Sequence, residues 1–370
     1  MRSAAISVDQ LWYDVPGGVG TYIRNLIPAL SAREPSLDLA LFHARFDRPD
    51  PDEPSLAGRR VVTLPSSIRT LYPAWNTIGR PAMPSSLASA DVVHATSAVA
   101  VPPVRREQRL VVTIHDLAFL RFPEHFPPRW RLLYRLGLRA ALRRADAILV
   151  PSRTTGEDVL RHGAIDPARV RVTPLAPALN IGTDDPGPVI ARMGIAPPYV
   201  LFVGTLEPRK NVVSLVRAYR RAVAGGLEHS LVLAGAPGWG TDALERELAL
   251  DAPGRIVRTG FVPAGDLDAV YRGASMFVYP SVYEGFGLPV MEAMAHGVPT
   301  ITSNASSLPE VVGDAAITVD PTSVDAIAGA IQTVASDATT AARLADAGRR
   351  RAASFTWDET ARLTFDAYRS

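Results

Sequence analysis

The chain alternates short apolar segments with longer amphipathic ones, and this alternation constrains its fold more than any other feature. In the first half the apolar segments read AAISV, DVVHA, LVVTIHD and AILVPS, and amphipathic segments such as VGTYIRNLIPALSAR and RTTGEDVLRHG lie between or after them. The apolar segments are almost continuously hydrophobic, as strands are in a parallel sheet that helices cover on both faces. We therefore predict a β/α arrangement, with Thr154 and Glu157 forming a capping box at the start of one helix.

The same rhythm restarts in the second half, which indicates a second domain. Apolar segments recur as YVLFVG, HSLVLAG, RIVRTGF, SMFVYPS, VPTITS and AAITV. A stretch rich in Pro, Gly and Asp precedes them, and we predict that residues 179–198 are a linker. The predicted class is α/β, with two Rossmann-like, doubly wound domains, 1–178 and 199–354, that face each other across a cleft. The last helix, 355–370, is expected to pack back toward the N-terminal domain. A length of 370 residues suits two such domains.

Composition and charge indicate where the protein is expected to act and which kind of ligand it is expected to bind. A hydrophobic content of 47% with 21% charged residues is ordinary for a soluble globular protein, and no segment offers the ~20 apolar residues of a membrane-spanning helix. The N-terminal segment lacks the apolar stretch of a signal peptide, so we expect a cytoplasmic protein. Residues 1–180 carry 23 arginines against 16 acidic residues, whereas residues 181–370 carry 16 basic and 21 acidic residues. The basic first half suggests an anionic partner such as phosphate, acidic lipid or nucleic acid.

Lys210 is the only lysine among 39 lysine and arginine residues. It follows the apolar segment YVLFV and Gly204, and Asn211 is the expected N-cap of the helix that comes next. Arg209 and Lys210 therefore stand between the carboxyl end of a strand and a helix N-terminus, which is a phosphate-binding position. A single lysine in an arginine-rich chain suggests a site that needs a compact ammonium. Chance survival at the surface is the alternative.

The segment VYEGFGLPVME has the pattern of a second anion-binding element. Pro289 falls at a favoured early helical position, so a helix is expected to begin near Leu288. Gly285 and Gly287 flank Phe286 and would let backbone N–H groups approach an anion at the positive end of the helix dipole.

Two carboxylates accompany this segment. Glu284 is expected on the loop and Glu292 about one turn into the helix. Beside a phosphate they would repel the ligand unless they accept hydrogen bonds from its hydroxyl groups. A nucleotide sugar has a diphosphate in the middle and hydroxyls at both ends. Glu292 would then bind the ribose diol and Glu284 the transferred sugar.

The glutamate pair in EGFGLPVME resembles the signature of the family-four retaining glycosyltransferases of GT-B fold. The segments AMAHGVPTITSNASSLPEVVGDAA, GTLEPRKN, GGVGTYIRNL, TIHDLAFL, ADAILVPS and GFV are also similar to that family, and together they extend over nearly the whole chain. TIHDLAFLRFPEHFP and GTLEPRKN look most like its mannosyltransferase branch. The resemblance implies metal-independent, retaining transfer of a hexose from a nucleotide sugar to a polysaccharide or glycolipid acceptor, with no cofactor. GDP-mannose is the expected donor and a UDP-sugar is the alternative.

Carried over to this sequence, the resemblance implies specific roles. The catalytic residues would be His115, Arg209, Lys210 and Glu284. The donor would be bound by Gly18, Arg209, Lys210, Val262, Glu284, Gly285, Phe286, Gly287, Leu288 and Glu292. In this arrangement Gly18 approaches the phosphate from the N-terminal domain, His115 faces the transferred sugar, and Val262 lies near the base. Many members have arginine directly after the glycine where this chain has Thr205, so Arg209 is expected to supply that charge.

Other motifs give weaker signals. GGVGTYI begins like a dinucleotide-binding fingerprint, but Ile23 occupies the place of its last glycine, which argues against NAD binding. Two Asp-x-Asp triplets occur, Asp50 to Asp52 in a Pro-rich loop and Asp266 to Asp268, which is expected to cap a helix. We predict no metal site at either.

Two histidines have simple structural interpretations. His94 ends an apolar segment, so it either approaches the cleft or is a hydrogen-bonded histidine in the core. His296 stands beside Gly297 and is interpreted as a helix-end residue.

The segment RWRLLYRLGLRAALRR, residues 129–144, is predicted to be a basic amphipathic helix. It carries six arginines, with Trp130 and Tyr134 among them and no acidic residue. It is either a solvated helix or a peripheral contact with anionic lipid at the inner face of the cell membrane, or with a lipid-linked diphosphate acceptor. No nucleic-acid-binding motif accompanies it, so nucleic acid is not an expected partner.

Two other functional classes stay open from the sequence alone. Paired glutamates also serve glycoside hydrolases as acid and base, although that function leaves Arg209 and Lys210 without a purpose. A non-catalytic protein that binds a sugar nucleotide without turnover is the third candidate.

Overall fold

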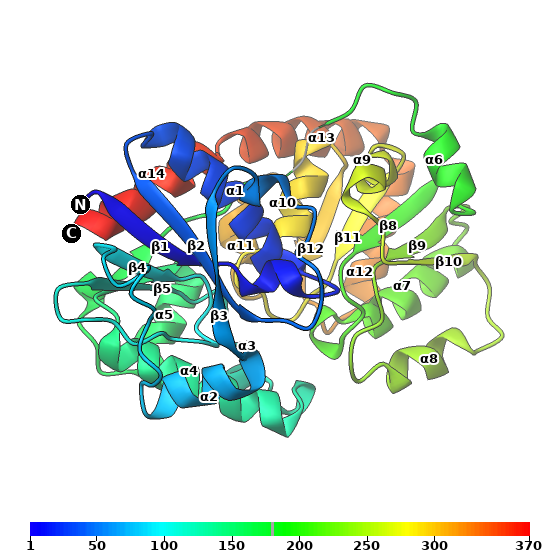
Figure 1. The fold of residues 1–370 in the computed structure, drawn as a ribbon. Coiled ribbons are helices and arrows are strands. Elements are labelled where there is room, and N and C mark those ends of the chain that lie inside the picture. Colours follow the sequence, from blue (N-terminus) through cyan, green and yellow to red (C-terminus); the bar gives the residue numbers. More distant parts are fainter. Residues whose placement is uncertain (179–180) are drawn as a thin grey trace. The chain divides into compact units, whose positions relative to one another are not determined.

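The computed structural model describes residues 1–178 and 181–370, and the chain divides into two compact units (Figure 1). Unit 1 comprises Met1–Leu175 and Thr356–Ser370, and unit 2 comprises Ala176–Phe355. Each unit is built on one sheet whose described strands all pair in parallel, with helices between consecutive strands. The predicted α/β class with two doubly wound domains is confirmed.

Unit 1 contains a sheet with the strand order β3-β2-β1-β4-β5-β6-β7 in the described chain. Its strands are β1 Ser3–Ser7, β2 Asp38–Arg45, β3 Arg60–Ser67, β4 Val92–Ala95, β5 Arg109–Thr113, β6 Ala147–Val150 and β7 Val170–Val172. Its α-helices are α1 Gly17–Arg33, α2 Ile68–Thr77, α3 Ala118–Arg121, α4 Pro128–Arg144, α5 Arg153–His162 and α14 Trp357–Arg369. Short 3-10 turns occur at η1 Asp9–Trp12, η2 Pro54–Leu56, η3 Pro123–His125 and η4 Pro167–Arg169.

The last helix, α14, packs on unit 1, as expected. It lies against α1 and against strands β5, β6 and β7. The Tyr368 hydroxyl lies 2.7 Å from His94 Nδ1, and Thr360 Oγ1 donates to the Pro174 carbonyl at 2.6 Å. His94 Nε2 is 2.8 Å from Thr113 Oγ1, so both ring nitrogens are hydrogen-bonded, and burial lowers the pKa of His94 to about 3. Of the two interpretations of His94, the hydrogen-bonded core histidine is therefore the one observed.

Unit 2 contains a sheet with the strand order β10-β9-β8-β11-β12-β13 in the described chain. Its strands are β8 Tyr199–Val203, β9 Ser230–Ala234, β10 Ile256–Gly260, β11 Met276–Tyr279, β12 Thr300–Ser303 and β13 Ile317–Val319. Its α-helices are α6 Gly187–Arg192, α7 Val212–Ala224, α8 Asp242–Leu248, α9 Ala264–Arg272, α10 Leu288–Ala295, α11 Leu308–Val312, α12 Val324–Ser336 and α13 Ala338–Ala353. The 3-10 turn η5, Pro208–Lys210, follows β8.

Of the predicted linker, 179–198, residues 179–180 lie outside the described part of the chain. The rest includes α6, which packs against α9 within unit 2. Two contacts hold the segment before α6 on α9. The Gly182 N–H donates to Asp268 Oδ1 at 3.0 Å, and Arg272 Nη1 donates to the Asp184 carbonyl at 2.5 Å.

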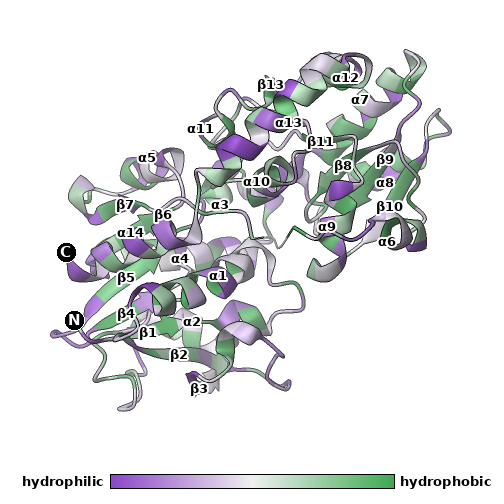
Figure 2. Cartoon of the chain, turned by 90° about the horizontal axis from the view of Figure 1, so that it is seen from above, coloured by the Kyte–Doolittle hydropathy of each residue, from purple (hydrophilic) through white to green (hydrophobic). Residues whose placement is uncertain are grey.

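Hydrophobic strands form the core of each sheet (Figure 2). In unit 2 the rings of Phe202 on β8 and Phe277 on β11 both stack on Tyr279, with centroids 5.5 and 5.7 Å away. This stack fixes the Tyr279 ring at the carboxyl end of β11. Among the described residues, no helix combines the length and apolar character that crossing a membrane requires.

The predicted capping box is wrong in detail. Ser152, not Thr154, is the N-cap of α5, because Ser152 Oγ accepts a hydrogen bond from the Thr155 N–H at 3.1 Å. Glu157 instead pairs with Arg161 one turn later, at 3.2 Å. The helix begins two residues earlier than the pattern indicated, and Thr155 takes the position expected of Glu157 relative to its cap.

Candidate functional site

The predicted phosphate residues lie at the point where the strand order of unit 2 reverses. The chain runs outward from β8 to β9 and β10, then returns to β11 on the other side of β8. Ligands of doubly wound sheets bind outside the carboxyl ends of the strands at such a switch point. The turn after β8 carries Arg209 and Lys210, and the loop after β11 carries Glu284, so the structure brings together residues about 75 positions apart in the sequence.

Lys210 and Arg209 both bind the carboxylate of Glu284. Lys210 Nζ donates to Glu284 Oε1 at 2.6 Å, and Arg209 Nη1 donates to Glu284 Oε2 at 2.9 Å. Arg209 also donates to the Tyr283 carbonyl at 2.7 Å and to Glu207 Oε1 at 2.7 Å. We call Glu207, Arg209, Lys210 and Glu284 the charged cluster; their side chains are all nearly buried.

Lys210 is held in a pocket that suits an ammonium. Its side chain is buried, its Nζ donates to the Tyr279 hydroxyl at 2.6 Å, and it lies 5.1 Å from the centroid of the Tyr279 ring. Two of its three N–H donors are thus used by Tyr279 and Glu284, and among the described residues the third has no partner. Burial and the neighbouring Arg209 guanidinium lower the pKa of Lys210, while Glu284 acts in the opposite direction. A planar guanidinium would not reproduce these two short contacts from one nitrogen.

The formal charges of the cluster cancel, which the sequence did not indicate. Two cations face two carboxylates, Glu207 and Glu284. Burial by itself would raise the pKa of Glu284, but Arg209 and Lys210 outweigh burial and hold it at about 2. Ser281 Oγ and the Tyr279 hydroxyl also donate to Glu284 Oε1, at 2.7 and 3.0 Å. Glu284 is therefore ionised at neutral pH and cannot serve as a proton donor.

The loop after Glu284 is fixed by its own backbone and by two serines. Ser306 Oγ and Ser307 Oγ both donate to the Glu284 carbonyl, at 2.6 and 2.9 Å. Gly287 precedes α10 with φ +97°, a conformation that favours glycine, and a Cβ there would also displace Leu308 Cδ2, which lies 2.6 Å away. The predicted helix start at Leu288 is confirmed.

The loop residues predicted to bind through their backbone are packed tightly. Gly285, Phe286, Gly287 and Leu288 are all buried, and Pro289 lies in the first turn of α10. The Phe286 ring meets Phe355 edge-on, with centroids 5.7 Å apart, so this side chain belongs to the core of unit 2. Any contact of this segment with an anion would come from the backbone at the N-terminus of α10.

Glu292 lies in α10 in an environment opposite to that of Glu284. Its carboxylate accepts a hydrogen bond from the Tyr271 hydroxyl at 3.0 Å, and among the described residues it has no cationic partner. Burial raises the pKa of Glu292 to about 7, and the Tyr271 bond lowers it only in part. A carboxylate of this kind gains from hydroxyl donors, as a ribose diol would supply.

A hydrogen-bonded chain connects this region with the segment before α6. The Tyr271 ring stacks on His296, with centroids 5.0 Å apart. His296 ends α10, as predicted. Its Nδ1 lies 2.8 Å from the Glu292 carbonyl and its Nε2 3.0 Å from Asp268 Oδ1. Asp268 is also bound by Arg272 at 2.8 Å. The expectation that the triplet ending in Asp268 caps a helix is wrong, because α9 begins at Ala264 after Pro263.

Two further sequence predictions in unit 2 fall outside the charged cluster. Val262 is buried between β10 and α9, and its role near a base stays a prediction. Asn211 is the N-cap residue of α7, as predicted, but its side chain makes no capping bond. Its backbone adopts φ +57°, and its side chain is used elsewhere, because Nδ2 donates to the carbonyls of Pro280 and Pro321 at 3.1 and 2.7 Å. Asn211 therefore ties the turn after β8 to the loops after β11 and β13.

Gly18 and His115 belong to unit 1, at the carboxyl ends of its strands. Gly18 is exposed in the first turn of α1, which follows β1. His115 follows β5, and its Nε2 donates to the Thr96 carbonyl at 2.8 Å. Burial lowers the pKa of His115, so the neutral ring presents Nδ1 as an acceptor. Their approach to a donor bound in unit 2 stays a prediction.

The basic helix is observed as α4. Trp130 and Tyr134 are partly buried, and the Tyr134 ring stacks on Phe119 with centroids 5.3 Å apart. Arg131 and Arg144 donate to backbone carbonyls of unit 1 and so serve its structure. The other four arginines of the helix are exposed, namely Arg129, Arg135, Arg139 and Arg143.

Comparisons with known proteins agree across both units. Residues 16–176 match the family described as Glycosyltransferase Family 4, and residues 194–351 match the family described as Glycosyl transferases group 1. The O-antigen chain mannosyltransferase B of Escherichia coli is 36% identical over 270 residues, which are 71% of this chain and 71% of that protein.

Two solved structures show the same fold over nearly the full length. A sucrose-phosphate synthase from Thermosynechococcus elongatus gives a TM-score of 0.75 at 24% identity and covers 100% of this chain and 98% of its own. Anabaena HepE in complex with UDP and glucose gives a TM-score of 0.75 at 18% identity and covers 99% of each chain. At these identities the likeness concerns the fold.

Proposed function

The chain belongs to the family 4 glycosyltransferases of GT-B fold, and we propose from this premise that it is a retaining mannosyltransferase that uses GDP-mannose. The acceptor would be a polysaccharide or a glycolipid. The single observation that carries the proposal is the charged cluster at the switch point of unit 2, beside the N-terminus of α10. The choice of mannose is supported by the relative named as an O-antigen chain mannosyltransferase. A UDP-sugar is the second candidate, supported by the UDP and glucose bound to HepE.

In the proposed complex the donor diphosphate lies against Lys210 and the N-terminus of α10. The third N–H of Lys210 would bind a phosphate oxygen, and the backbone at Gly287 and Leu288 would face the negative charge. Glu284 would accept a hydrogen bond from a hydroxyl of the transferred sugar, and Glu292 would accept from the ribose diol. His115, with Nδ1 as acceptor, would bind another hydroxyl of the transferred sugar.

The proposed reaction needs no protein nucleophile and no metal ion. The bond between the sugar C1 and the phosphate oxygen breaks, and a bond between C1 and the acceptor oxygen forms on the same face. The proton of the acceptor hydroxyl passes to the departing phosphate oxygen, so the products are the glycoside and the nucleoside diphosphate. Lys210 stabilises the charge that develops on the leaving group.

The geometry also argues against a glycoside hydrolase. Such an enzyme needs one carboxylate that is free to act as nucleophile or base. The Glu284 carboxylate is instead bound by Lys210, Arg209, Ser281 and Tyr279. These four donors make the Glu284 carboxylate a weaker base and nucleophile, so it is better suited to accept a hydrogen bond from the sugar than to attack it.

Nucleotide release tests the proposal. The protein would be incubated separately with GDP-mannose, UDP-glucose and UDP-N-acetylglucosamine, with Lys210→Ala as the control for contaminating activity. We expect release of GDP from GDP-mannose, and an α-configured product if the reaction retains configuration. Donor binding without turnover would identify a non-catalytic binder, and cleavage of a simple glycoside without any nucleotide would identify a hydrolase. A preference for a UDP-sugar would overturn the choice of donor but not the reaction class.

We place the enzyme in the cytoplasm as part of the same proposal, working on a glycan or lipid-linked acceptor. Peripheral contact with the inner face of the cell membrane through residues 129–144 was predicted from the sequence.

A further inference from the structure

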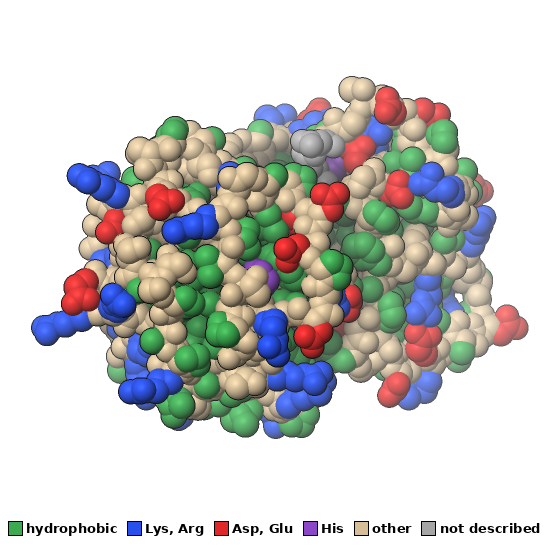
Figure 3. All heavy atoms as spheres, in the orientation of Figure 1, with side chains coloured by type: hydrophobic (Ala, Val, Ile, Leu, Met, Phe, Trp, Pro, Cys, Tyr) green, Lys and Arg blue, Asp and Glu red, His purple; other side chains and the backbone are tan. Residues whose placement is uncertain are grey.

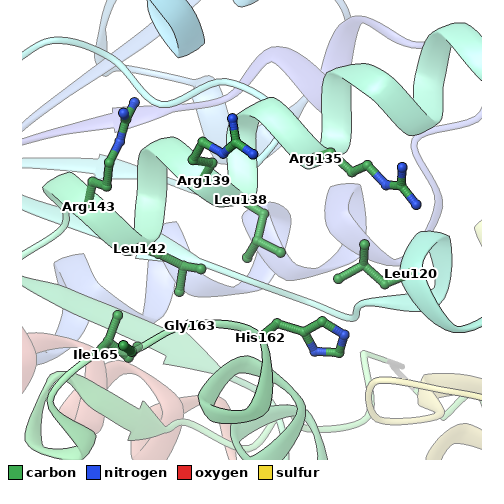
Figure 4. Close-up of a pocket in the computed structure, with 10 residues that line it drawn as sticks. Leu120, Arg135, Leu138, Arg139, Leu142, Arg143, His162, Gly163 and Ile165 are labelled. Carbon is green, nitrogen blue, oxygen red and sulfur yellow. The ribbon is translucent and has the colours of Figure 1, made fainter.

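A groove on unit 1 lies between α4 and the end of α5, apart from the strand ends that carry Gly18 and His115. It has a volume of about 550 Å³. Figure 4 shows its floor, where Leu138 and Leu142 point from α4 toward His162 and Ile165. Its lining consists of Leu120, Arg135, Leu138, Arg139, Leu142, Arg143, His162, Gly163, Ala164 and Ile165. A Cβ on Gly163 would lie 2.8 Å from Leu142 Cδ1, so this glycine lets the chain after α5 close over the floor.

The rim of the groove is strongly basic. Arg135, Arg139 and Arg143 follow one another at four-residue intervals, so they lie along one face of α4. All three are exposed, and among the described residues none of them has an acidic partner. No aspartate or glutamate lines the groove. Like charges at this spacing destabilise a helix unless an anion lies against them.

Two apolar side chains near these arginines, one on α4 and one after α2, are open to solvent. Leu132 is three residues before Arg135, so it lies on the arginine face, and 60% of its surface is exposed. A second depression of about 440 Å³ also borders Arg143, and its lining includes Ile78, Arg105 and Arg106 together with one acidic residue, Asp146. Ile78 is 71% exposed. In Figure 3 basic and hydrophobic side chains alternate along the lower edge of unit 1, over α2 and α4.

We propose that the α4 face, defined as Leu132, Arg135, Arg139 and Arg143, docks on an anionic bilayer and that the groove beside it holds a phospholipid phosphate headgroup. Guanidinium groups bind phosphate oxygens in pairs, and the apolar floor accommodates the glycerol and the first methylenes. Exposed Leu132 and Ile78 would insert among the acyl chains, as apolar residues of interfacial helices do.

A bilayer explains these features better than the two alternatives. A helix that contacts only water does not account for the exposed side chains of Leu132 and Ile78 near arginines that have no acidic partner among the described residues. Single-stranded nucleic acid is bound by exposed aromatic rings between basic residues, but Trp130 and Tyr134 are partly buried and the Tyr134 ring stacks on Phe119. The proposal deepens the membrane contact predicted for residues 129–144 and does not depend on glycosyl transfer, because vesicle binding requires no donor.

Vesicle flotation of the full chain tests the proposal. The vesicles would contain phosphatidylcholine alone or with phosphatidylglycerol, at low and at high salt. The test variant is Arg135→Gln/Arg139→Gln/Arg143→Gln. The matched control is Arg246→Gln/Arg343→Gln/Arg350→Gln, which changes the net charge equally at exposed positions of unit 2. Thermal unfolding and donor turnover would establish that both variants are folded.

The wild type and the control variant should float with vesicles that contain phosphatidylglycerol, and much less at high salt. Each basic residue near an anionic surface contributes about fivefold to partition, so the test variant should lose about 100-fold. Leu132→Ser should weaken binding even at high salt, when the electrostatic contribution is screened. Flotation of the test variant equal to that of the control, or binding of a single-stranded oligonucleotide in preference to anionic vesicles, would overturn the proposal. A single Arg139→Glu variant provides the same comparison if the triple variant fails to fold.

Discussion

Replacing Lys210 with alanine distinguishes the contribution of this residue to stability from its proposed contribution to catalysis. The change removes the ammonium that lies 2.6 Å from both Glu284 Oε1 and the Tyr279 hydroxyl. Glu284 keeps Arg209 at 2.9 Å and Ser281 at 2.7 Å, so its buried charge is not left alone. We therefore expect a loss of about 2 kcal/mol in the free energy of unfolding, comparable to one hydrogen bond to a charged group. A domain with ordinary stability stays folded after such a loss.

The expected loss of catalysis is larger. A cation about 4 Å from the leaving diphosphate, at an effective dielectric constant of about 20, contributes about 4 kcal/mol. Loss of one preorganised partner of this kind typically lowers kcat by about 10²- to 10³-fold. Urea unfolding would measure the first effect, and release of nucleotide at saturating donor would measure the second.

Tyr279→Phe is the matched control for Lys210→Ala. It removes the hydroxyl that bonds to both Lys210 Nζ and Glu284 Oε1 but leaves every charge in place. If charge on the leaving group is what matters, this variant should lose less than about tenfold in kcat. A folded Lys210→Ala protein with nearly full kcat would refute the assignment. Equal losses in the two variants would show that packing of the pocket, and not the ammonium, limits the rate.

Three other predictions concern the stability of single sites. Burial raises the pKa of Glu292 from 4.5 to about 7, so the folded chain holds this proton more tightly than the unfolded chain, and the carboxyl becomes destabilising as pH rises through that interval. We expect the free energy of unfolding of Glu292→Gln, measured in urea and compared with that of the wild type, to rise by up to about 3 kcal/mol between about pH 4 and about pH 8. A difference that does not change with pH would contradict the raised pKa. Gly287→Ala should lower stability by about 1–3 kcal/mol in thermal unfolding, because φ is +97° and the new Cβ meets a side-chain atom at 2.6 Å. Gly265→Ala, with open space and a helical position, is the control and should be neutral or stabilising; equal losses in both would contradict the steric argument. Tyr368→Phe deprives buried His94 of a 2.7 Å hydrogen bond and should cost about 1–3 kcal/mol in chemical unfolding, and an unchanged midpoint would show that another group replaces the hydroxyl.

The sequence predicted the strands because their signal is local. YVLFV and MFVY are apolar runs whose burial depends little on what lies elsewhere in the chain, and they appear as β8 and β11. Lys210 and Glu284 come just after these strands, so their positions at the strand ends could also be predicted from the sequence. Parallel sheets place carboxyl ends at one edge, so the two residues were expected near the same ligand.

The direct bonds within the charged cluster were not predicted. Lys210 and Glu284 meet because β8 and β11 are neighbours, with Val200 opposite Met276, and no local pattern specifies that pairing. The part played by Glu207 was missed for the same reason. A usable signal existed in Tyr279 and Ser281, which are polar residues at the end of an otherwise apolar strand.

Side-chain capping bonds were predicted less well than helix starts, because α7 and α10 begin where the sequence indicated. At α5 the choice between Ser152 and Thr154 as N-cap depends on where the backbone leaves the strand β6, which a spacing rule does not determine. At Asn211 the side chain could cap α7 or bridge two loops, and only the folded loops supply the carbonyls of Pro280 and Pro321. The Asn211 error comes from partners that are distant in the sequence, whereas the partner of Ser152, Thr155, is local and the error lies in where the strand was expected to end.

The neutral charge of the cluster is consistent with a site that must release its product. Two uncompensated cations would hold a nucleoside diphosphate tightly before and after transfer, which strengthens binding without accelerating the reaction. Because Glu207 and Glu284 balance Arg209 and Lys210, the ground state of a bound donor gains little from net charge. The stabilisation that remains comes from directed donors, namely the third N–H of Lys210 and the backbone at the start of α10. Directed donors act most strongly on the charge that appears as the bond to C1 breaks, so they favour the transition state over the bound donor.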